Sequence, residues 1–169
     1  MGRTGVVFAG GDAPRRLPIP PHDFAVAADS GLHVAVDAGI DVDLVVGDFD
    51  SVEPALAAGI PQDRYPVDKD ATDLELAVAA VISHGCKRLV VIGAEGGRLS
   101  HLLGAVAVLA AAAEEGATVE WLTSSATAHL VIDEVTVRGK PGDLISLIPT
   151  GGDATGVTTE GLRWPLHGE

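Results

Sequence analysis

The sequence has little of several features that define common classes of protein. It holds a single cysteine, Cys86, which excludes a disulfide framework and a zinc site built from cysteines. Its longest apolar stretch, residues 102–113, is too short to cross a bilayer, and its N-terminus lacks the hydrophobic core of a secretory signal. These absences predict a cytoplasmic protein with no membrane partner.

Basic residues are also scarce. Lys and Arg number 11 against 24 Asp and Glu, which gives a net charge of −13. The basic residues are scattered, so nothing offsets the repulsion that a nucleic-acid backbone would meet. We expect no nucleic-acid partner, and an anionic ligand must arrive with its own cation. The length of 169 residues and the apolar content of 47% suit one folded domain or two small ones.

Apolar runs and helical patterns alternate through the first two thirds of the chain. This alternation predicts an α/β domain with a parallel sheet. Strands are expected at 5–9, 24–28, 44–46 and 89–92, helices at 32–38, 54–58, 72–84 and 101–115, and an extended connection at 62–66.

After residue 116 the pattern changes, because four strand-like runs follow one another with glycine and proline between them. This indicates a small antiparallel β unit and a boundary near residues 122–126. We therefore expect an α/β domain over residues 1–122 and a β domain over residues 123–169. The four runs are residues 118–122, 128–132, 135–138 and 144–148.

Aspartate is concentrated in one part of the chain, since ten of the fifteen lie between positions 29 and 73. Asp29, Asp48 and Asp50 follow predicted strands, and the carboxyl ends of parallel strands meet at the edge where ligands bind. Crowded carboxylates raise one another's pKa unless a cation lies among them. Such ligands suit Mg²⁺, which typically binds a few carboxylates together with substrate phosphates.

Asp48 and Asp50 are separated by one residue. In an extended segment such a pair points to the same side, so both carboxylates can meet one ion. The same motif occurs in phosphohydrolases and in nucleotide-sugar transferases. A solvated loop in which Asp50 caps the next helix explains the pair as well.

The segment Lys69-Asp70-Ala71-Thr72-Asp73-Leu74-Glu75 carries a helix start. Thr72 and Glu75 form a capping box, and the helix dipole favours Asp73. Lys69 and Asp70 have no such explanation. Asp70 and Asp73 could lie together at the helix entrance, where a metal-bound phosphate would also meet free N–H groups.

The segment Gly93-Ala94-Glu95-Gly96-Gly97-Arg98 lies between a predicted strand and a predicted helix. It matches neither of the two common glycine-rich phosphate fingerprints. A tight turn and a phosphate cradle both explain it, and Arg98 favours the cradle because a guanidinium can grip phosphate oxygens in bidentate fashion. His101 begins the next helix, where a lone histidine is more often structural.

Taken together, five segments resemble the thiamine pyrophosphokinase family. They occur in the family's order across nearly the whole chain, and the order is more specific than any one motif. The segments are Ala28-Asp29-Ser30-Gly31, Gly47-Asp48-Phe49-Asp50-Ser51, Lys69 to Ala77, Gly93 to His101, and Gly156-Val157-Thr158-Thr159-Glu160-Gly161-Leu162.

The resemblance implies an α/β nucleotide-binding domain followed by an antiparallel β-sandwich domain, usually in a homodimer. The implied reaction is transfer of the terminal pyrophosphoryl group of ATP to the hydroxyethyl oxygen of thiamine, which gives thiamine diphosphate and AMP. ATP and thiamine would be the small-molecule ligands and Mg²⁺ the cofactor.

The resemblance also implies roles for individual residues. Mg²⁺ on the triphosphate would be held by Asp48, Asp50, Asp70 and Asp73, which with Arg98 make up the catalytic set. Lys69 and Arg98 would contact phosphate oxygens. The full nucleotide-binding set is Asp29, Lys69, Thr72, Gly96, Gly97, Arg98, Ser100 and His101.

Two features depart from the family pattern. The family usually has Arg-x-Asp-His after the glycine loop, whereas Ser100 here brings no charge. The family also continues beyond the position of Glu169 with further strands, so we expect an incomplete β domain with an exposed edge. The alternatives are a nucleotide-binding relative without turnover, and another Mg²⁺-dependent enzyme acting on phosphate esters or nucleotide sugars.

Overall fold

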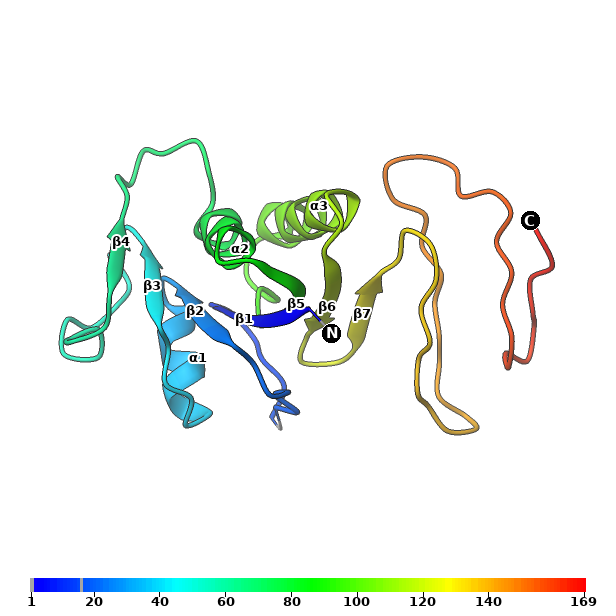
Figure 1. Ribbon diagram of the computed structural model, residues 1–169, viewed down its shortest axis with the longest axis horizontal. Helices are drawn as coiled ribbons and strands as arrows, with labels where there is room; N and C mark the ends of the chain where they lie inside the picture. Colours follow the sequence, from blue (N-terminus) through cyan, green and yellow to red (C-terminus); the bar gives the residue numbers. More distant parts are fainter. Residues whose placement is uncertain (1, 16) are drawn as a thin grey trace. The chain divides into compact units, whose positions relative to one another are not determined.

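The computed structural model describes residues 2–15 and 17–169 and contains one seven-stranded sheet (Figure 1). The strand order is β4-β3-β2-β1-β5-β6-β7, and all neighbouring pairs are parallel except β6 and β7. The mostly parallel α/β sheet that the alternating patterns predicted is confirmed. Its strands are β1 (Arg3–Ala9), β2 (Phe24–Ala28), β3 (Leu44–Gly47), β4 (Gln62–Arg64), β5 (Cys86–Ile92), β6 (Thr118–Leu122) and β7 (Thr127–Leu130).

The strand order reverses direction at β1, in the middle of the sheet. β1 pairs with β2 on one side and with β5 on the other, so the chain first runs outward to β4 and then returns to β5. In open parallel sheets, ligands bind outside the carboxyl ends of the strands at such a reversal. The residues that follow β1, β2, β3 and β5 therefore lie at the edge where this topology places a ligand.

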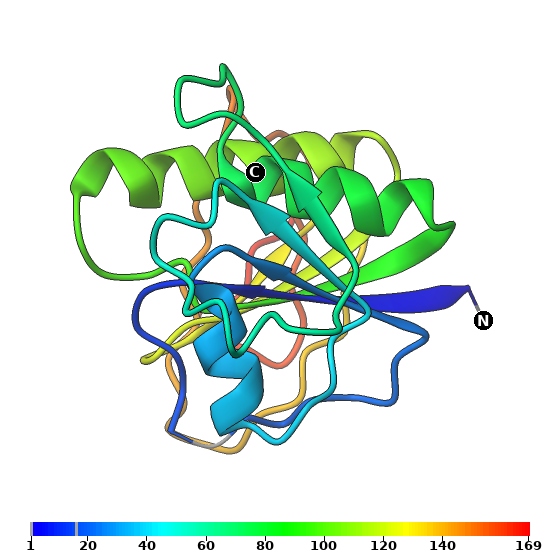
Figure 2. The ribbon, with the colours of Figure 1, turned by 90° about the vertical axis from the view of Figure 1, so that its left-hand side faces the viewer.

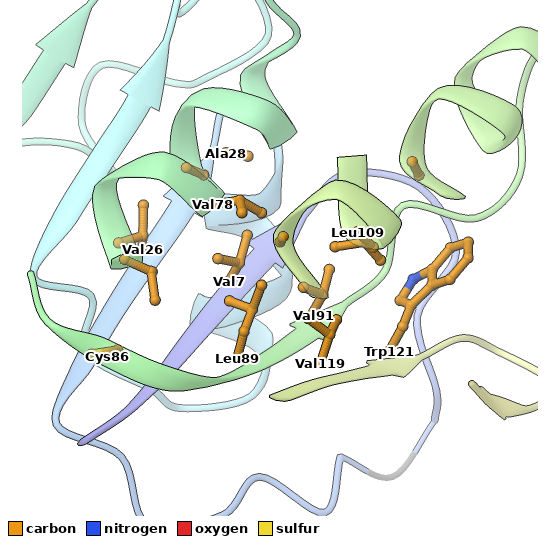
Figure 3. Close-up of a cluster of buried hydrophobic side chains, with 14 of the residues drawn as sticks. Val7, Val26, Ala28, Val78, Cys86, Leu89, Val91, Leu109, Val119 and Trp121 are labelled. Carbon is orange, nitrogen blue, oxygen red and sulfur yellow. The ribbon is translucent and has the colours of Figure 1, made fainter. Parts of the chain in front are cut away.

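Helices cover both faces of the sheet (Figure 2). α2 (Asp73–Ser83) and α3 (Leu99–Glu114) pack on one face, and α1 (Gly31–Asp37) packs on the other. Successive strand residues point to opposite faces, so Val7 packs on the side of α2 and α3 while Val6 packs on the side of α1. Burial on both faces explains why these strands are continuous apolar runs. Figure 3 shows the cluster beneath α2 and α3.

The start of α2 confirms the predicted helix cap. Thr72 is the N-cap residue, and its hydroxyl oxygen accepts a hydrogen bond from the Glu75 N–H at 3.2 Å. α3 begins at Leu99, directly after the glycine loop, and buries Ala105 and Leu109 against the sheet. No helix in the described part of the chain is long and apolar enough to cross a membrane.

Two segments between β3 and α2 differ from the expectation. Residues 62–64 form the parallel edge strand β4, and residues 54–58 form turns instead of a helix. Pro54 and Gly59 bound a segment too short to repay helix nucleation. The segment packs instead through Val52 and Ala57, which are buried in a small cluster with Leu32 of α1.

The first compact unit extends to Val135, beyond the boundary expected between residues 122 and 123. The reason is β7, which pairs with β6 in antiparallel register and so joins the main sheet. A tight turn connects the two strands, in which the Thr123 N–H donates to the Ala126 carbonyl at 2.9 Å.

The second unit, Thr136–Glu169, contains no β-strand, so the expected strands at 135–138 and 144–148 are not present. One isolated antiparallel bridge joins Thr158 and His167. The apolar runs that suggested strands are present in the sequence, but a strand also needs a hydrogen-bonded neighbour. Large apolar side chains in this unit are exposed, Leu144 to 98% and Trp164 to 78%.

Candidate functional site

Two strand ends bring the central carboxylates together. Ala28 of β2 pairs with Val46 of β3, so the residues that follow the two strands are neighbours. The Asp29 N–H donates to the Val46 carbonyl at 2.8 Å and fixes this junction. Carboxylate oxygens of Asp29, Asp48 and Asp50 all lie within 4.8 Å of one another. We call these three residues the acidic triad.

Asp29 is the buried member of the triad. Its exposed fraction is 8%, and its Oδ1 has no hydrogen-bond partner among residues 2–15 and 17–169. Burial raises the pKa of Asp29 above its ordinary value; the Ser30 N–H opposes this, and the charges of Asp73, Asp48 and Asp50 raise the pKa further. A buried acceptor without a donor, facing two other carboxylates, is a site that a cation would satisfy.

Asp48 and Asp50 meet through a turn and not through an extended segment. Phe49 has a positive φ of 63°, so the expectation of extended geometry was wrong although the two carboxylates do converge. The Asp50 N–H donates to Asp48 Oδ1 at 3.2 Å, and the Ser51 hydroxyl donates to Asp50 Oδ1 at 2.7 Å. The Asp50 N–H is the main reason that the pKa of Asp48 is lowered, and Lys69 lowers it further.

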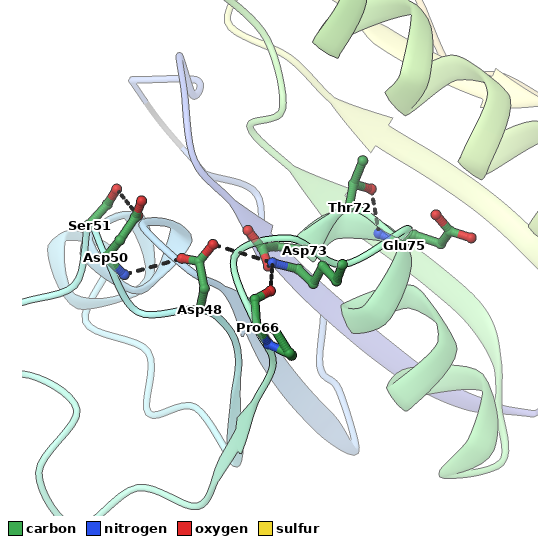
Figure 4. A network of polar contacts seen from close by, with 8 residues as sticks. Asp48, Asp50, Ser51, Pro66, Thr72, Asp73 and Glu75 are labelled. Carbon is green, nitrogen blue, oxygen red and sulfur yellow. Dashed lines mark hydrogen bonds and ion pairs between the residues drawn. The ribbon is translucent and has the colours of Figure 1, made fainter.

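Lys69 connects Asp48 of the triad to Asp73 at the start of α2. Figure 4 shows Asp48 beside Asp73. The Lys69 Nζ lies 3.3 Å from Asp48 Oδ2 and 3.0 Å from Asp73 Oδ1, and it donates to the Pro66 carbonyl at 3.4 Å. The contact with Asp73 has the distance of an ion pair without the alignment of a hydrogen bond. Among the residues that the structure describes, Asp73 Oδ1 therefore also lacks a hydrogen-bond donor. Burial would lower the pKa of Lys69, but its contacts with Asp73 and then Asp48 raise it.

Gly47 makes room for this arrangement at the end of β3. Its φ is +149°, and a Cβ there would lie 3.1 Å from both Asp29 Cβ and Asp73 Oδ1. Asp29 and Asp73 therefore flank the same glycine, one from the end of β2 and the other from the first turn of α2. Asp70, in contrast, is exposed and lies outside the acidic triad.

The glycine loop between β5 and α3 packs against the end of β1. The Ala94 N–H donates to the Gly10 carbonyl at 2.9 Å, and the Asp12 N–H donates to the Glu95 carbonyl at 2.8 Å. A Cβ on Gly11 would lie 2.1 Å from the Glu95 carbonyl oxygen, so only glycine fits this approach. The loop is thus held at the reversal point of the sheet.

Glu95 holds the glycine loop in place, a role that sequence reasoning missed. Its carboxylate accepts hydrogen bonds from the N–H and hydroxyl of Ser124 and from the hydroxyl of Ser125, all in the β6–β7 turn. The hydroxyl and N–H of Ser124 are the main causes of a lowered Glu95 pKa. The sequence does contain both partners, a carboxylate within a glycine-rich segment and a Thr-Ser-Ser segment. They lie about 30 residues apart, so nothing in the sequence indicated that they would meet.

The remaining expected residues lie on the outer part of this loop and on the first turn of α3. All of these residues are exposed, namely Gly96, Gly97, Arg98, Ser100 and His101. Arg98 Nη2 contacts His101 Nε2 at 2.5 Å, so the structure brings these two together. Within residues 2–15 and 17–169, Arg98 forms no ion pair with the acidic triad.

The chemistry of these donors fits a divalent cation of the Mg²⁺ type. Three hard carboxylate oxygens converge, one of them buried without a donor, and a cationic lysine borders them. The fold and this site define a class: an α/β protein with a carboxylate cluster at the carboxyl ends of its parallel strands, where a divalent cation would fit.

Comparison with known proteins identifies the family. The family model "Thiamin pyrophosphokinase, catalytic domain" matches residues 19–121, and "Thiamin pyrophosphokinase, vitamin B1 binding domain" matches residues 133–169. The first match alone spans more than half of the chain. The chain belongs to the thiamin pyrophosphokinase family, which is an enzyme family.

Individual relatives agree with this assignment. The thiamine pyrophosphokinase of Bacillus subtilis is 26% identical over 153 residues, which cover 86% of this chain and 72% of that protein. A crystal structure of the Bacillus subtilis enzyme matches with a TM-score of 0.63 and 26% identity over 72% of this chain. A family protein from Enterococcus faecalis matches with a TM-score of 0.58 and 29% identity over the same share. Both matches span 61% of the solved chains.

Proposed function

We propose that this protein transfers the terminal pyrophosphoryl group of ATP to thiamine and forms thiamine diphosphate and AMP. The observation that carries the proposal is the acidic triad, in which a buried Asp29 oxygen without a donor faces Asp48 and Asp50. Membership of the family supplies the substrate class, and the family is typically magnesium-dependent.

In this proposal Asp29, Asp48 and Asp50 hold Mg²⁺, and Asp70 and Asp73 remain further candidates on the adjoining loop and helix. When bound, Mg²⁺ supplies positive charge against the triphosphate. Lys69 and Arg98 add positive charge at phosphate oxygens, from the helix entrance and from the glycine loop respectively. The nucleotide side of the proposed site is completed by Thr72, Gly96, Gly97, Ser100 and His101.

The proposed reaction balances as one displacement. The hydroxyethyl oxygen of thiamine forms a bond to the β-phosphorus of ATP and releases its proton to solvent water. The bond from that phosphorus to the oxygen of the α-phosphate breaks, and AMP leaves with that oxygen. Nothing in this step requires a covalent enzyme intermediate, so the protein acts by positioning and by charge neutralisation. The hydrogen bond from the Asp29 N–H to the Val46 carbonyl serves that positioning.

We also propose that the protein acts as a homodimer. The support is the exposed apolar surface of residues 136–169, which includes Leu144 and Ile148, and the outer edge of β7, which is the last strand of the sheet. Exposed sheet edges and apolar patches are typical places for a second chain to bind. Size-exclusion chromatography with light scattering tests this, and a monomer at micromolar concentration contradicts it.

One observation favours a second function, nucleotide binding without turnover. Ser100 lies in the first turn of α3, where the family usually carries an aspartate, and a serine brings no negative charge there. The loss of an acid near the reacting hydroxyl would leave ATP binding intact and slow the transfer.

The deciding experiment is an AMP-release assay with ATP and Mg²⁺, in the presence and absence of thiamine. Thiamine-dependent AMP, accompanied by thiamine diphosphate, supports the transferase. Asp50→Asn should abolish this release, while Asp37→Asn on the exposed end of α1 should leave it unchanged. ATP binding by calorimetry with no AMP supports the second function, and absence of both contradicts the two proposals together.

A further inference from the structure

Lys69 occupies an unusual position for a lysine. Its side chain is 11% exposed, and its Nζ lies between Asp48 Oδ2 at 3.3 Å and Asp73 Oδ1 at 3.0 Å. Lysine is almost never buried unless it is paired, because its ammonium group loses hydration. The two contacts come from different elements, the end of β3 and the first turn of α2, so Lys69 also connects these elements.

Both carboxylate oxygens of Asp48 already accept hydrogen bonds from the protein. Its Oδ1 accepts the Asp50 N–H at 3.2 Å, and its Oδ2 accepts the Lys69 ammonium. Asp29 is not bonded in this way, since its buried Oδ1 has no hydrogen-bond donor in the described part of the chain. A cation that binds the acidic triad therefore finds Asp29 open and Asp48 already bound to Lys69.

We propose that Lys69 is the resident counter-ion of this edge, and that a divalent cation and Lys69 compete for Asp48. In the protein without a divalent cation, the ammonium group holds Asp48 and Asp73 and offsets part of the charge of four neighbouring carboxylates. When the cation binds the triad, Lys69 leaves Asp48, keeps Asp73, and becomes available to phosphate oxygens. This inference rests on the proposed function, because it assigns a regulated role to a residue of the same site.

A merely structural ion pair predicts the opposite behaviour. If Lys69 only held the β4–α2 loop in place, its removal would loosen the triad and weaken metal binding. If it competes with the cation, its removal frees Asp48 and also removes a positive charge that repels the incoming ion. The sign of the change in metal affinity separates the two roles.

The test measures Mn²⁺ binding without nucleotide, by electron paramagnetic resonance or calorimetry, for the wild type, Lys69→Met and Lys87→Met. Lys87 is exposed on β5, so its substitution changes the net charge equally without touching the site. We expect Lys69→Met to bind Mn²⁺ roughly tenfold more tightly and Lys87→Met to change affinity by less than about twofold. With ATP present, Lys69→Met should instead bind Mn²⁺–ATP more weakly.

Unchanged or weaker Mn²⁺ affinity in Lys69→Met overturns the inference. If Lys69→Met does not fold, the intact wild type gives the answer by nuclear magnetic resonance. Mg²⁺ titration should then shift the side-chain signals of Lys69 and leave those of Lys87 in place, and an unmoved Lys69 signal contradicts competition. If the wild type binds no Mn²⁺ at all, both the inference and the metal site fall, whereas thiamine-dependent AMP release tests the proposed function separately.

Discussion

The Glu95 carboxylate accepts hydrogen bonds from both the N–H and the hydroxyl of Ser124, at 2.6 Å and 2.5 Å. It thereby joins the glycine loop that follows β5 to the turn between β6 and β7. Glu95→Gln removes the charge that strengthens these bonds, and we expect a loss of about 1 kcal/mol in the free energy of unfolding at pH 7. Urea unfolding measures it, with Glu134→Gln on an exposed loop as the matched control.

The hydrogen bonds between Glu95 and Ser124 predict that the free energy of unfolding depends on pH. The folded protein lowers the pKa of Glu95, so its contribution is present above the ordinary glutamate pKa and is lost as the pH falls through the lowered value. The stability difference between the wild type and Glu95→Gln should therefore shrink on acidification. A difference that stays constant from pH 7 to below the glutamate range would show that the charge of Glu95 is not involved.

Asp29→Asn should raise the stability of the metal-free protein and weaken metal binding. The raised pKa of Asp29 means that the folded state holds its proton more tightly, so this carboxyl lowers stability as the pH rises from the ordinary aspartate pKa through the raised value. In chelator at neutral pH, the variant should melt higher than the wild type, and this gain should vanish at low pH. Its Mn²⁺ affinity should fall by at least about tenfold, equivalent to ~1.4 kcal/mol.

Asp29→Asn also carries little backbone risk, because Asp29 has a φ of 43° and asparagine tolerates this left-handed region well. Thermal melting with and without Mn²⁺ measures both effects. A variant that loses stability in chelator yet binds Mn²⁺ normally would contradict the assignment of Asp29 to the triad.

Gly47→Ala should disturb the site by crowding neighbouring side chains as well as by straining the backbone. A Cβ on Gly47 would press on Asp29 and Asp73 at 3.1 Å, whereas a Cβ on Gly39, whose φ is also positive, would meet nothing within 4 Å. We expect both variants to lose about 1 kcal/mol or more of stability from strain. Only Gly47→Ala should also weaken Mn²⁺ binding. Equal Mn²⁺ affinities for the two variants would count against the crowding that we describe.

Ser100→Asp tests the departure from the family pattern. The first turn of α3 contains no acidic residue and its N-cap side chain makes no capping bond, so an aspartate there should stabilise the helix by about 0.5 kcal/mol. Ala107→Asp, on an exposed position farther along α3, adds the same charge away from the helix start and should give no such gain. Under the proposed function, thiamine-dependent AMP release should rise in Ser100→Asp alone, and an unchanged rate would separate this position from the chemistry.

Much of this edge could be predicted from local patterns. Apolar runs that end in Asp29 and Asp48 imply convergence, because parallel strands share one carboxyl edge. Thr72 and Glu75 imply the start of α2 because a capping box involves only four adjacent residues. Each of these signals lies within a short stretch of chain, where sequence and geometry are directly related.

The features that escaped prediction depend on partners far apart in the chain. The contact of Glu95 with Ser124 joins two loops, and loops carry no periodicity to read. The turn at Phe49 depends on a positive φ in a residue other than glycine, which composition does not reveal. The strands expected at 135–138 and 144–148 are absent for a related reason, since a local apolar run indicates a strand but does not supply the neighbouring strand that it must pair with.

The central place of β1 has a consequence for how the chain folds as it is synthesised. β1 can pair with β2 early, because Gly5 meets Phe24 after a short connection, but its other edge pairs with β5, where Val6 meets Val90. That second pairing closes a long loop, and long-range parallel contacts form slowly. A nascent chain that has not yet released β5 from the ribosome therefore presents an open, apolar strand edge, and this is the stage at which protection by a chaperone would matter most.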